Sequence, residues 1–242
     1  MARIKLLHEK IKQEIKMTGP ILIVEDEAIL REILKDYFLN AGYSVLEAID
    51  GEEALKVFQE NELSLIILDI MLPKLDGWSL CRRIRKSSNV PIIILTARTD
   101  EDDTLLGFEL GADDYVTKPY NPLVLLARAK RLLHQREPKN EMADDYLESG
   151  GIQVHTPSRT VQVNKKEIAL THTEYEILLY LMENKGIVIT REQLITKVWG
   201  YEHIGDDRTI NSHMRNLRSK LGDHSTCVKT IVRTGYKFED IQ

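Results

Sequence analysis

The sequence predicts an α/β domain with a parallel sheet, followed by a smaller α+β domain. In the first half, short apolar runs alternate with segments of helical period, a pattern typical of β-α units whose sheet is covered on both faces. In the second half, short alternating segments precede amphipathic helices and a C-terminal hairpin. With 242 residues, the chain is long enough for two domains of ordinary size.

The first half contains five such β-α units. The expected strands are residues 21–24, 44–47, 65–68, 92–95 and 114–116. The expected helices are residues 28–40, 52–59, 77–86, 102–110 and 122–134. The strand runs are continuous in Val, Ile and Leu, which suits strands that are buried on both faces.

Composition excludes several classes of protein. The chain is 43% hydrophobic and 29% charged, which is ordinary for a globular protein and excludes a disordered or fibrous one. Its longest apolar runs have the length of strands, far below the roughly 20 residues that cross a bilayer, and residues 1–17 lack the apolar core of a signal peptide. Cys81 and Cys227 fit no metal-ligand spacing, so we expect reduced thiols in a cytoplasmic protein that does not bind membranes.

Charge is distributed unevenly along the chain. The net charge is -5, with 14 basic and 20 acidic residues over 18–136 but 13 basic and 12 acidic over 146–242. Residues 208–221 hold four Lys or Arg and no acid. This concentration predicts a local basic helix on an otherwise balanced domain.

Polar residues directly follow four of the expected strands. Glu25 and Asp26 follow the first strand, Asp69 the third, Thr96 the fourth and Lys118 the fifth. In open α/β sheets the site lies beyond the carboxyl ends of the strands, so these side chains should converge. Three crowded carboxylates need a counter-ion, and Mg²⁺ suits a site that also meets phosphate oxygens.

Asp69 is suited to accept a phosphoryl group. A carboxylate with an ordinary pKa of about 3.9 is ionised at neutral pH and needs no base to act as a nucleophile. Phosphoryl transfer mainly requires positioning and neutralisation of oxygens, which a cation, a hydroxyl and a lysine supply. Taken singly, Asp69 fits a helix cap, Thr96 a turn and Lys118 a surface charge. Their occurrence in order after four strands favours the functional interpretation.

Four segments resemble the receiver domains of two-component response regulators over residues 20–136: ILIVEDE, LIILDIMLPKLDGW, IIILTAR and GADDYVTKPY. The resemblance implies a flavodoxin-like receiver with strand order 2-1-3-4-5. It also implies that Asp69 is the phosphoacceptor, and that Glu25 and Asp26 hold Mg²⁺ with Asp69 and the Met71 backbone carbonyl.

The same resemblance implies a switch beside the phosphoacceptor. Thr96 would bind a phosphoryl oxygen and rotate inward, and Tyr115 would follow it. Lys118 would pair with the phosphoryl group, and Pro119 resembles the family's cis-proline.

The second half begins after a polar segment. We expect an N-terminal extension at 1–17, a receiver domain at 18–136, a linker at 137–145 and a second domain at 146–242. Short strands at 152–154, 160–163 and 167–170 precede helices at 171–184 and about 191–198. The first helix is capped by Thr171 or Thr173 and the second by Thr190, and a third begins after Asp206 or Asp207.

The third helix has two distinct faces. Its predicted core stripe is Ile210, Met214, Leu217 and Leu221. Its opposite side carries Arg208, Ser212, Arg215 and Ser219, flanked by Asn211 and Asn216. Such a face carries the groups that read base edges and phosphates, although an ordinary solvated helix would look the same by itself.

The second half resembles the winged-helix effector of the OmpR/PhoB family over residues 149–239. The resemblance rests on LTHTEYEILLYLMENKG, VITREQLITKVWG, DRTINSHMRNLRSKLG and VKTIVRTGYKF. It implies an α+β winged helix-turn-helix domain with a recognition helix at 208–221. The implied DNA contacts are Arg208, His213, Arg215, Asn216 and Arg218 on the helix, and Thr230 and Arg233 on the wing.

The wing and the third helix each depart from the family pattern, and both departures bear on the target sequence. Val232 and Arg233 stand where relatives usually have Arg-Gly, and Asn216 stands where many carry arginine.

Trp199 and the loop at 200–207 resemble the region that touches phosphate backbone and RNA polymerase.

We interpret the chain as a phosphorylation-dependent transcriptional regulator and not as a turnover enzyme. A sensor histidine kinase would phosphorylate Asp69, and the protein would then form a homodimer and bind promoter DNA. The expected dimer interface contains Leu105, Phe108, Glu109, Asp114, Leu126, Arg128 and Lys130.

Two alternatives remain open. One is a DNA-binding regulator with an inert receiver, and the other is a phosphatase or phosphotransferase that turns over on Asp69. A haloacid-dehalogenase-type enzyme would want a second Asp at position 71, which is Met. Residues 1–17 place Ile4, Leu7, Ile11 and Ile15 at helical spacing, which fits an extra helix or a start at Met17.

Overall fold

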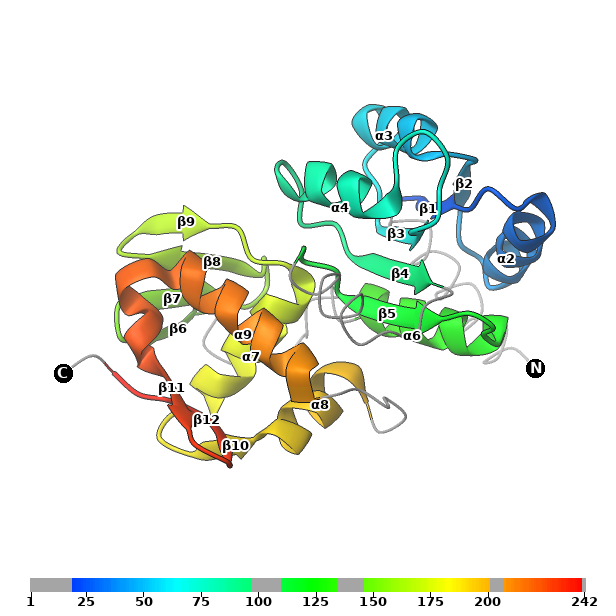
Figure 1. The fold of residues 1–242 in the computed structure, drawn as a ribbon. Helices are drawn as coiled ribbons and strands as arrows, with labels where there is room; N and C mark the ends of the chain where they lie inside the picture. Colours follow the sequence, from blue (N-terminus) through cyan, green and yellow to red (C-terminus); the bar gives the residue numbers. More distant parts are fainter. Residues whose placement is uncertain (1–18, 97–109, 135–145, 201–206, 241–242) are drawn as a thin grey trace, which may run out of the picture. The chain divides into compact units, whose positions relative to one another are not determined.

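The computed structural model describes residues 19–96, 110–134, 146–200 and 207–240. The chain splits into two compact units, and each is described by itself (Figure 1). No helix within these ranges is long and apolar enough to cross a membrane. The expected N-terminal extension, the linker and all but the last residue of the helix expected at 102–110 lie outside the described residues.

The first unit is built on a five-stranded parallel sheet. Its strands are β1 (Ile21–Val24), β2 (Val45–Ala48), β3 (Leu65–Asp69), β4 (Ile92–Thr96) and β5 (Asp114–Thr117). The order is β2-β1-β3-β4-β5, which confirms the expected 2-1-3-4-5 arrangement. Every residue of β1, β3 and β4 is buried, as their continuous apolar sequences predict.

Helices cover both faces of this sheet (Figure 1). They are α2 (Ala28–Asn40), α3 (Gly51–Glu60), α4 (Gly77–Arg85) and α6 (Pro122–His134). On one face, Leu34 and Phe38 of α2 share a core with Leu125 and Ala129 of α6. On the other face, α3 and α4 lie side by side, and Asp50 and Asp76 cap their first turns by accepting backbone N–H bonds.

The second unit contains two antiparallel sheets. The first runs in chain order: β6 (Tyr146–Ser149), β7 (Ile152–His155), β8 (Thr160–Val163) and β9 (Lys166–Ile168). The second has the order β10-β12-β11, with β10 (Val188–Thr190), β12 (Gly235–Phe238) and β11 (Val228–Ile231). The predicted C-terminal hairpin is therefore confirmed, and a third strand that the sequence analysis did not predict, β10, pairs with it.

Three helices and a 3-10 turn complete the second unit. They are α7 (His172–Glu183), α8 (Arg191–Trp199), α9 (Asp207–Leu221) and η1 (Gly222–Cys227). Thr171 caps α7 in a reciprocal box with Glu174, and Thr190 caps α8 in the same way with Gln193. Thr171, not Thr173, is therefore the cap of the first helix.

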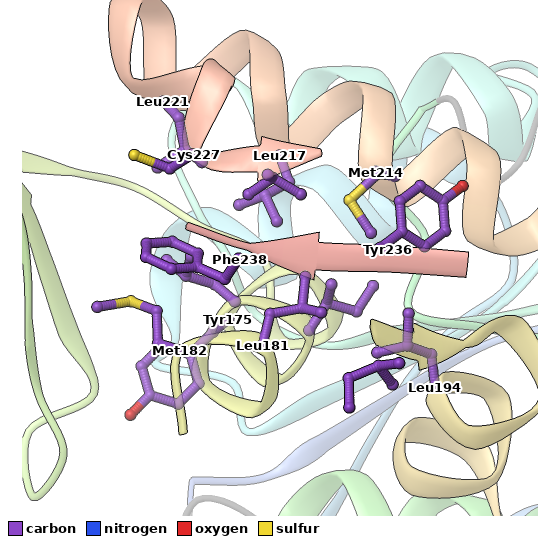
Figure 2. Close-up of a cluster of buried hydrophobic side chains, with 14 of the residues drawn as sticks. Tyr175, Leu181, Met182, Leu194, Met214, Leu217, Leu221, Cys227, Tyr236 and Phe238 are labelled. Atoms are coloured by element: carbon purple, nitrogen blue, oxygen red, sulfur yellow. The ribbon is translucent and has the colours of Figure 1, made fainter. Parts of the chain in front are cut away.

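The apolar stripe of α9 anchors this helix in the second core. Ile210, Met214, Leu217 and Leu221 are all buried, which confirms the predicted stripe. Figure 2 shows Met214, Leu217 and Leu221 in the same cluster as Tyr236 and Phe238 of β12, with Leu181 of α7 and Leu194 of α8. The recognition helix expected at 208–221 therefore packs on both the hairpin and the preceding helices.

One side chain of α9 differs from the prediction. Ser212 was expected on the polar outer face, but it is buried, together with Thr209 and His213. A residue's position on the helix does not by itself determine its exposure, so the prediction for Ser212 was wrong.

Candidate functional site

An acidic cluster lies where β1 and β3 end. β1 and β3 are adjacent, with Val24 paired to Leu68, so the residues that follow these strands lie together. Carboxylate oxygens of Glu25, Asp26 and Asp69 all lie within 4.8 Å of one another. Glu25 and Asp69 are buried, whereas Asp26 is exposed.

Lys118 bridges two of these carboxylates. Its Nζ donates to Glu25 Oε2 at 2.7 Å and to Asp69 Oδ2 at 2.6 Å. Burial alone would lower the pKa of Lys118, but the hydrogen bonds to Asp69 and Glu25 outweigh it and raise this pKa. Burial raises the pKa of Glu25, and the nearby Asp69 charge adds to that effect. The cluster thus concentrates negative charge that Lys118 only partly balances.

The backbone around Lys118 fixes the lysine beside β4. Its N–H donates to the Thr96 carbonyl at 2.6 Å, and the Lys118–Pro119 peptide bond is cis, as the family resemblance implies. Thr96 and Tyr115 are both buried. The structure therefore brings Glu25, Asp69, Thr96 and Lys118 to one edge of the sheet, as their positions after the strands predict.

The second oxygen of Asp69 is held by the following loop. Met71 N–H donates to Asp69 Oδ1 at 2.9 Å, while the Met71 side chain is exposed. Gly77 packs directly on the Asp69 backbone, because a Cβ at residue 77 would lie 2.4 Å from the Asp69 carbonyl oxygen. This role of Gly77 was missed by the sequence analysis, although a glycine in LDGW was the available signal.

Arg31 supports the loop that carries the acidic pair. Its Nη1 donates to the Glu25 carbonyl at 2.8 Å and to the Asp26 carbonyl at 3.3 Å. Its Nε lies 3.6 Å from Glu47 Oε1, which orients the guanidinium. Sequence reasoning also missed Arg31, because its only signal was a basic residue one turn into α2.

The donors of this cluster fit a hard cation. Three carboxylates supply only oxygen ligands, and Mg²⁺ is bound in proteins by one or two carboxylates together with water and phosphate oxygens. The exposed Asp26 leaves one side of the cluster open to solvent. Glu25, Asp26 and Asp69 are therefore the residues that would hold Mg²⁺.

The described residues of the expected dimer surface carry an ion-pair network within one chain. Asp114 is fully buried, and its Oδ1 and Oδ2 lie 2.8 Å from Arg128 and 3.3 Å from Arg131. Leu126 is buried and Lys130 is half-buried. Leu105, Phe108 and Glu109 lie outside the described residues, so this surface stays a prediction.

The expected DNA contacts of α9 fall into different environments. Arg215 is exposed and Asn216 is half-buried, whereas His213 is buried with its ring 5.4 Å from that of Trp199. Arg208 lies in the first turn of the helix, and its side chain is outside the described part of the structure. A base contact by His213 would require its side chain to leave this packed position.

The wing places its two expected contacts at the surface. Thr230 lies on β11 and is exposed, and Arg233 is exposed in the turn between β11 and β12. Arg233 has a φ of 60°, the left-handed region that favours glycine. The arginine thus occupies a backbone conformation that the family's glycine adopts without strain.

These features together define a receiver-type α/β domain joined to a winged-helix domain. Residues 21–130 match the family model for the response regulator receiver domain, and residues 165–238 match that for the C-terminal domain of transcriptional regulatory proteins.

The chain is similar to curated transcriptional regulatory proteins over nearly their whole length. The chain is 40% identical over 224 residues to the Bacillus subtilis transcriptional regulatory protein YclJ, covering 91% of this chain and 99% of that one. It is also 40% identical over 235 residues to the alkaline phosphatase synthesis regulatory protein PhoP of B. subtilis, covering 93% and 98%. The solved structure of DrrB, a Thermotoga maritima OmpR/PhoB homolog, is 33% identical with a TM-score of 0.50 and coverage of 92% and 100%. The chain belongs to the OmpR/PhoB-type response regulators of two-component systems.

Proposed function

We propose that this response regulator accepts a phosphoryl group on Asp69 from a sensor histidine kinase and thereby controls its own binding to promoter DNA. The observation that carries the proposal is the position of the Asp69 carboxylate. It is buried, lies within 4.8 Å of two further carboxylates, and is hydrogen-bonded to Lys118. Fold stability alone rarely requires three acids and a lysine together at the carboxyl ends of neighbouring strands.

In the proposed transfer, an Asp69 carboxylate oxygen attacks the phosphorus atom of the donor's phosphohistidine. The new P–O bond forms as the P–N bond breaks, and the imidazole leaves with its electron pair and takes up a proton. Bound Mg²⁺ would neutralise phosphoryl oxygens during this step. Lys118 holds Asp69 Oδ2 beforehand and supplies a fixed positive charge for the incoming phosphoryl group.

The proposed output begins with Thr96, which lies on the strand next to Asp69. Leu95 pairs with Asp69 in the register of β3 and β4, so the Thr96 hydroxyl lies one residue beyond the phosphoacceptor. A hydrogen bond from Thr96 to the phosphoryl group would shift an existing equilibrium between receiver conformations toward the one that forms the homodimer. Tyr115 would move together with Thr96. Two winged-helix domains would then bind adjacent half-sites in the promoter, with α9 in the major groove, and contact RNA polymerase.

Phosphoramidate labelling with Mg²⁺ tests this function. We expect one stable, Mg²⁺-dependent acyl phosphate per chain, and none on Asp69→Asn, which keeps the shape of the side chain but removes the nucleophile. No labelling of the wild type would favour a regulator with an inert receiver. Rapid release of phosphate over many turnovers would favour a phosphatase, and labelling of Asp69→Asn at the wild-type level would refute the assigned residue.

A further inference from the structure

Arg218 uses its guanidinium within the winged-helix domain. Its Nε and Nη2 both donate to the Val228 carbonyl, at 3.0 and 2.6 Å, and Nη2 also donates to Thr230 Oγ1 at 2.8 Å. A guanidinium has five N–H donors in a fixed plane, and three of them are directed to the first strand of the wing by these contacts. Arg218 lies on α9, so the recognition helix is bonded to the wing.

A second bond joins the other strand of the wing to α9, nearer the start of the helix. Tyr236 of β12 donates its hydroxyl to Asn211 Oδ1 at 2.7 Å. Asn211 and Arg218 are seven residues apart, which is about two helical turns, or roughly 10 Å along α9. The Arg218 guanidinium also lies 5.7 Å from the centre of the Tyr236 ring. Two polar links and one ring contact therefore hold both wing strands against α9.

Burial sets Arg218 apart from an arginine that reaches into solvent. The residue is half-buried, and burial lowers its pKa, an effect that the neighbouring Tyr236 opposes. Arg215, three residues earlier on the same helix, is exposed. The family resemblance treats both arginines as DNA contacts, but the structure gives them different surroundings.

We propose that Arg218 is a positioning residue, which fixes the spacing and angle between α9 and the wing so that DNA meets both as one rigid unit. The inference rests on the proposed DNA binding, and it names a determinant of specificity within that site. Asn211 accepts a hydrogen bond from the Tyr236 hydroxyl, and this bond between the wing and α9 also sets the orientation of the Asn211 amide. A protein with a fixed helix-to-wing spacing should discriminate between DNA sites in which the two contacted regions are separated differently.

The experiment measures DNA affinity of the full-length protein by fluorescence anisotropy. The probe is a duplex selected by the wild-type protein from a random-sequence library. A second duplex carries one extra base pair between the segments protected by α9 and by the wing. The variants are R218K, which keeps the charge but cannot make the planar set of bonds, and R218A. The control is R82K, the same substitution at an exposed arginine of α4 in the receiver domain.

We expect R218K and R218A to weaken binding to the selected duplex by a similar factor, at least about tenfold. The salt dependence should stay at the wild-type slope in both variants, because no phosphate contact is lost. The ratio of affinities for the two duplexes should move toward one, a change that a smaller folded fraction would not produce. Amides of β11 and β12 in the DNA-free variants should exchange faster, while R82K should match the wild type in every measurement.

Two results would overturn the inference while leaving the proposed function intact. One is wild-type affinity in R218K with a salt slope lowered by about one in R218A, which would make Arg218 a direct phosphate contact. The other is unchanged discrimination between the two duplexes. If the wild-type protein selected no duplex from the library in either phosphorylation state, the proposed DNA binding would fail first and this inference with it.

Discussion

Individual side chains in this protein are held by neighbours that the sequence does not place beside them. Asp69 was predictable from its position after a strand, and its partner Lys118 from the order of strands. Gly77 and Arg31 were not, because their roles depend on a close backbone approach and on two carbonyl bonds that only the folded chain creates. Arg218 was assigned to DNA by resemblance, and its bonds to β11 could not be read from helical position.

Gly77→Ala tests the packing under the phosphoacceptor. A Cβ at 2.4 Å from the Asp69 carbonyl oxygen requires the backbone to shift, so we expect a loss of about 1–3 kcal/mol in the free energy of unfolding. The rate of labelling by phosphoramidate should fall as well. Urea denaturation and labelling kinetics measure the two effects. Wild-type values for both would show that the loop after β3 relaxes without moving Asp69.

Arg233→Gly separates the backbone strain of the wing from its proposed DNA contact. Glycine keeps this left-handed conformation without the strain of about 1–2 kcal/mol that a residue with a Cβ has there, and its greater flexibility in the unfolded chain offsets about 0.5–1 kcal/mol of that gain. The variant should therefore be up to about 1.5 kcal/mol more stable. It should also bind all DNA sequences more weakly, with a salt slope lower in magnitude by about one.

Arg233→Ala is the matched control, because alanine keeps the strain and loses the guanidinium. It should show the same loss of DNA affinity as glycine without the gain in stability. An unchanged salt slope in both variants would mean that this wing does not touch DNA.

Asn216→Ala on α9 should instead change base preference, since asparagine can bond an adenine edge in two places.

At the scale of elements, the sequence predicted nearly every described helix and strand but not their ends. The strand expected at 44–47 runs over Val45–Ala48, and α3 begins at Gly51 because Asp50 accepts from the N–H groups of Glu52 and Glu53. The sequence analysis missed β6 and β10, and the three residues of β10 are too few to show alternation. β10 forms because it pairs with the edge of β12 that is not paired with β11.

Capping is the element-scale feature that is simplest to test. Thr171→Ala and Thr190→Ala each remove one half of a reciprocal cap, and we expect each to cost about 1 kcal/mol in the free energy of unfolding. The loss should be larger at Thr171, because Thr171 and Glu174 are both buried. Thr226→Ala, at an exposed threonine of η1, is the control for urea denaturation. Equal stability of all three variants would contradict the role of the caps.

At the scale of the whole molecule, phosphorylation of the receiver domain would control dimerisation and DNA binding. Asp114 already pairs with Arg128 and Arg131 in its own chain, so a pair between protomers would have to share or exchange these partners. Charge reversal at Arg128 should reduce phosphorylation-induced dimerisation, as sedimentation of the phosphorylated protein can measure. Sedimentation like that of the wild type would show that this is the wrong surface.

In the proposed mechanism, the phosphorylation state of Asp69 sets the affinity of the winged-helix domain for DNA. The most direct test of this mechanism is the affinity of the full-length protein for its selected duplex, before and after phosphoramidate treatment with Mg²⁺, in the wild type and in Asp69→Asn. We predict that treatment tightens binding by the wild type at least about tenfold and leaves Asp69→Asn unchanged. Equal affinities of treated and untreated wild type, with the acyl phosphate present on Asp69, would contradict the account.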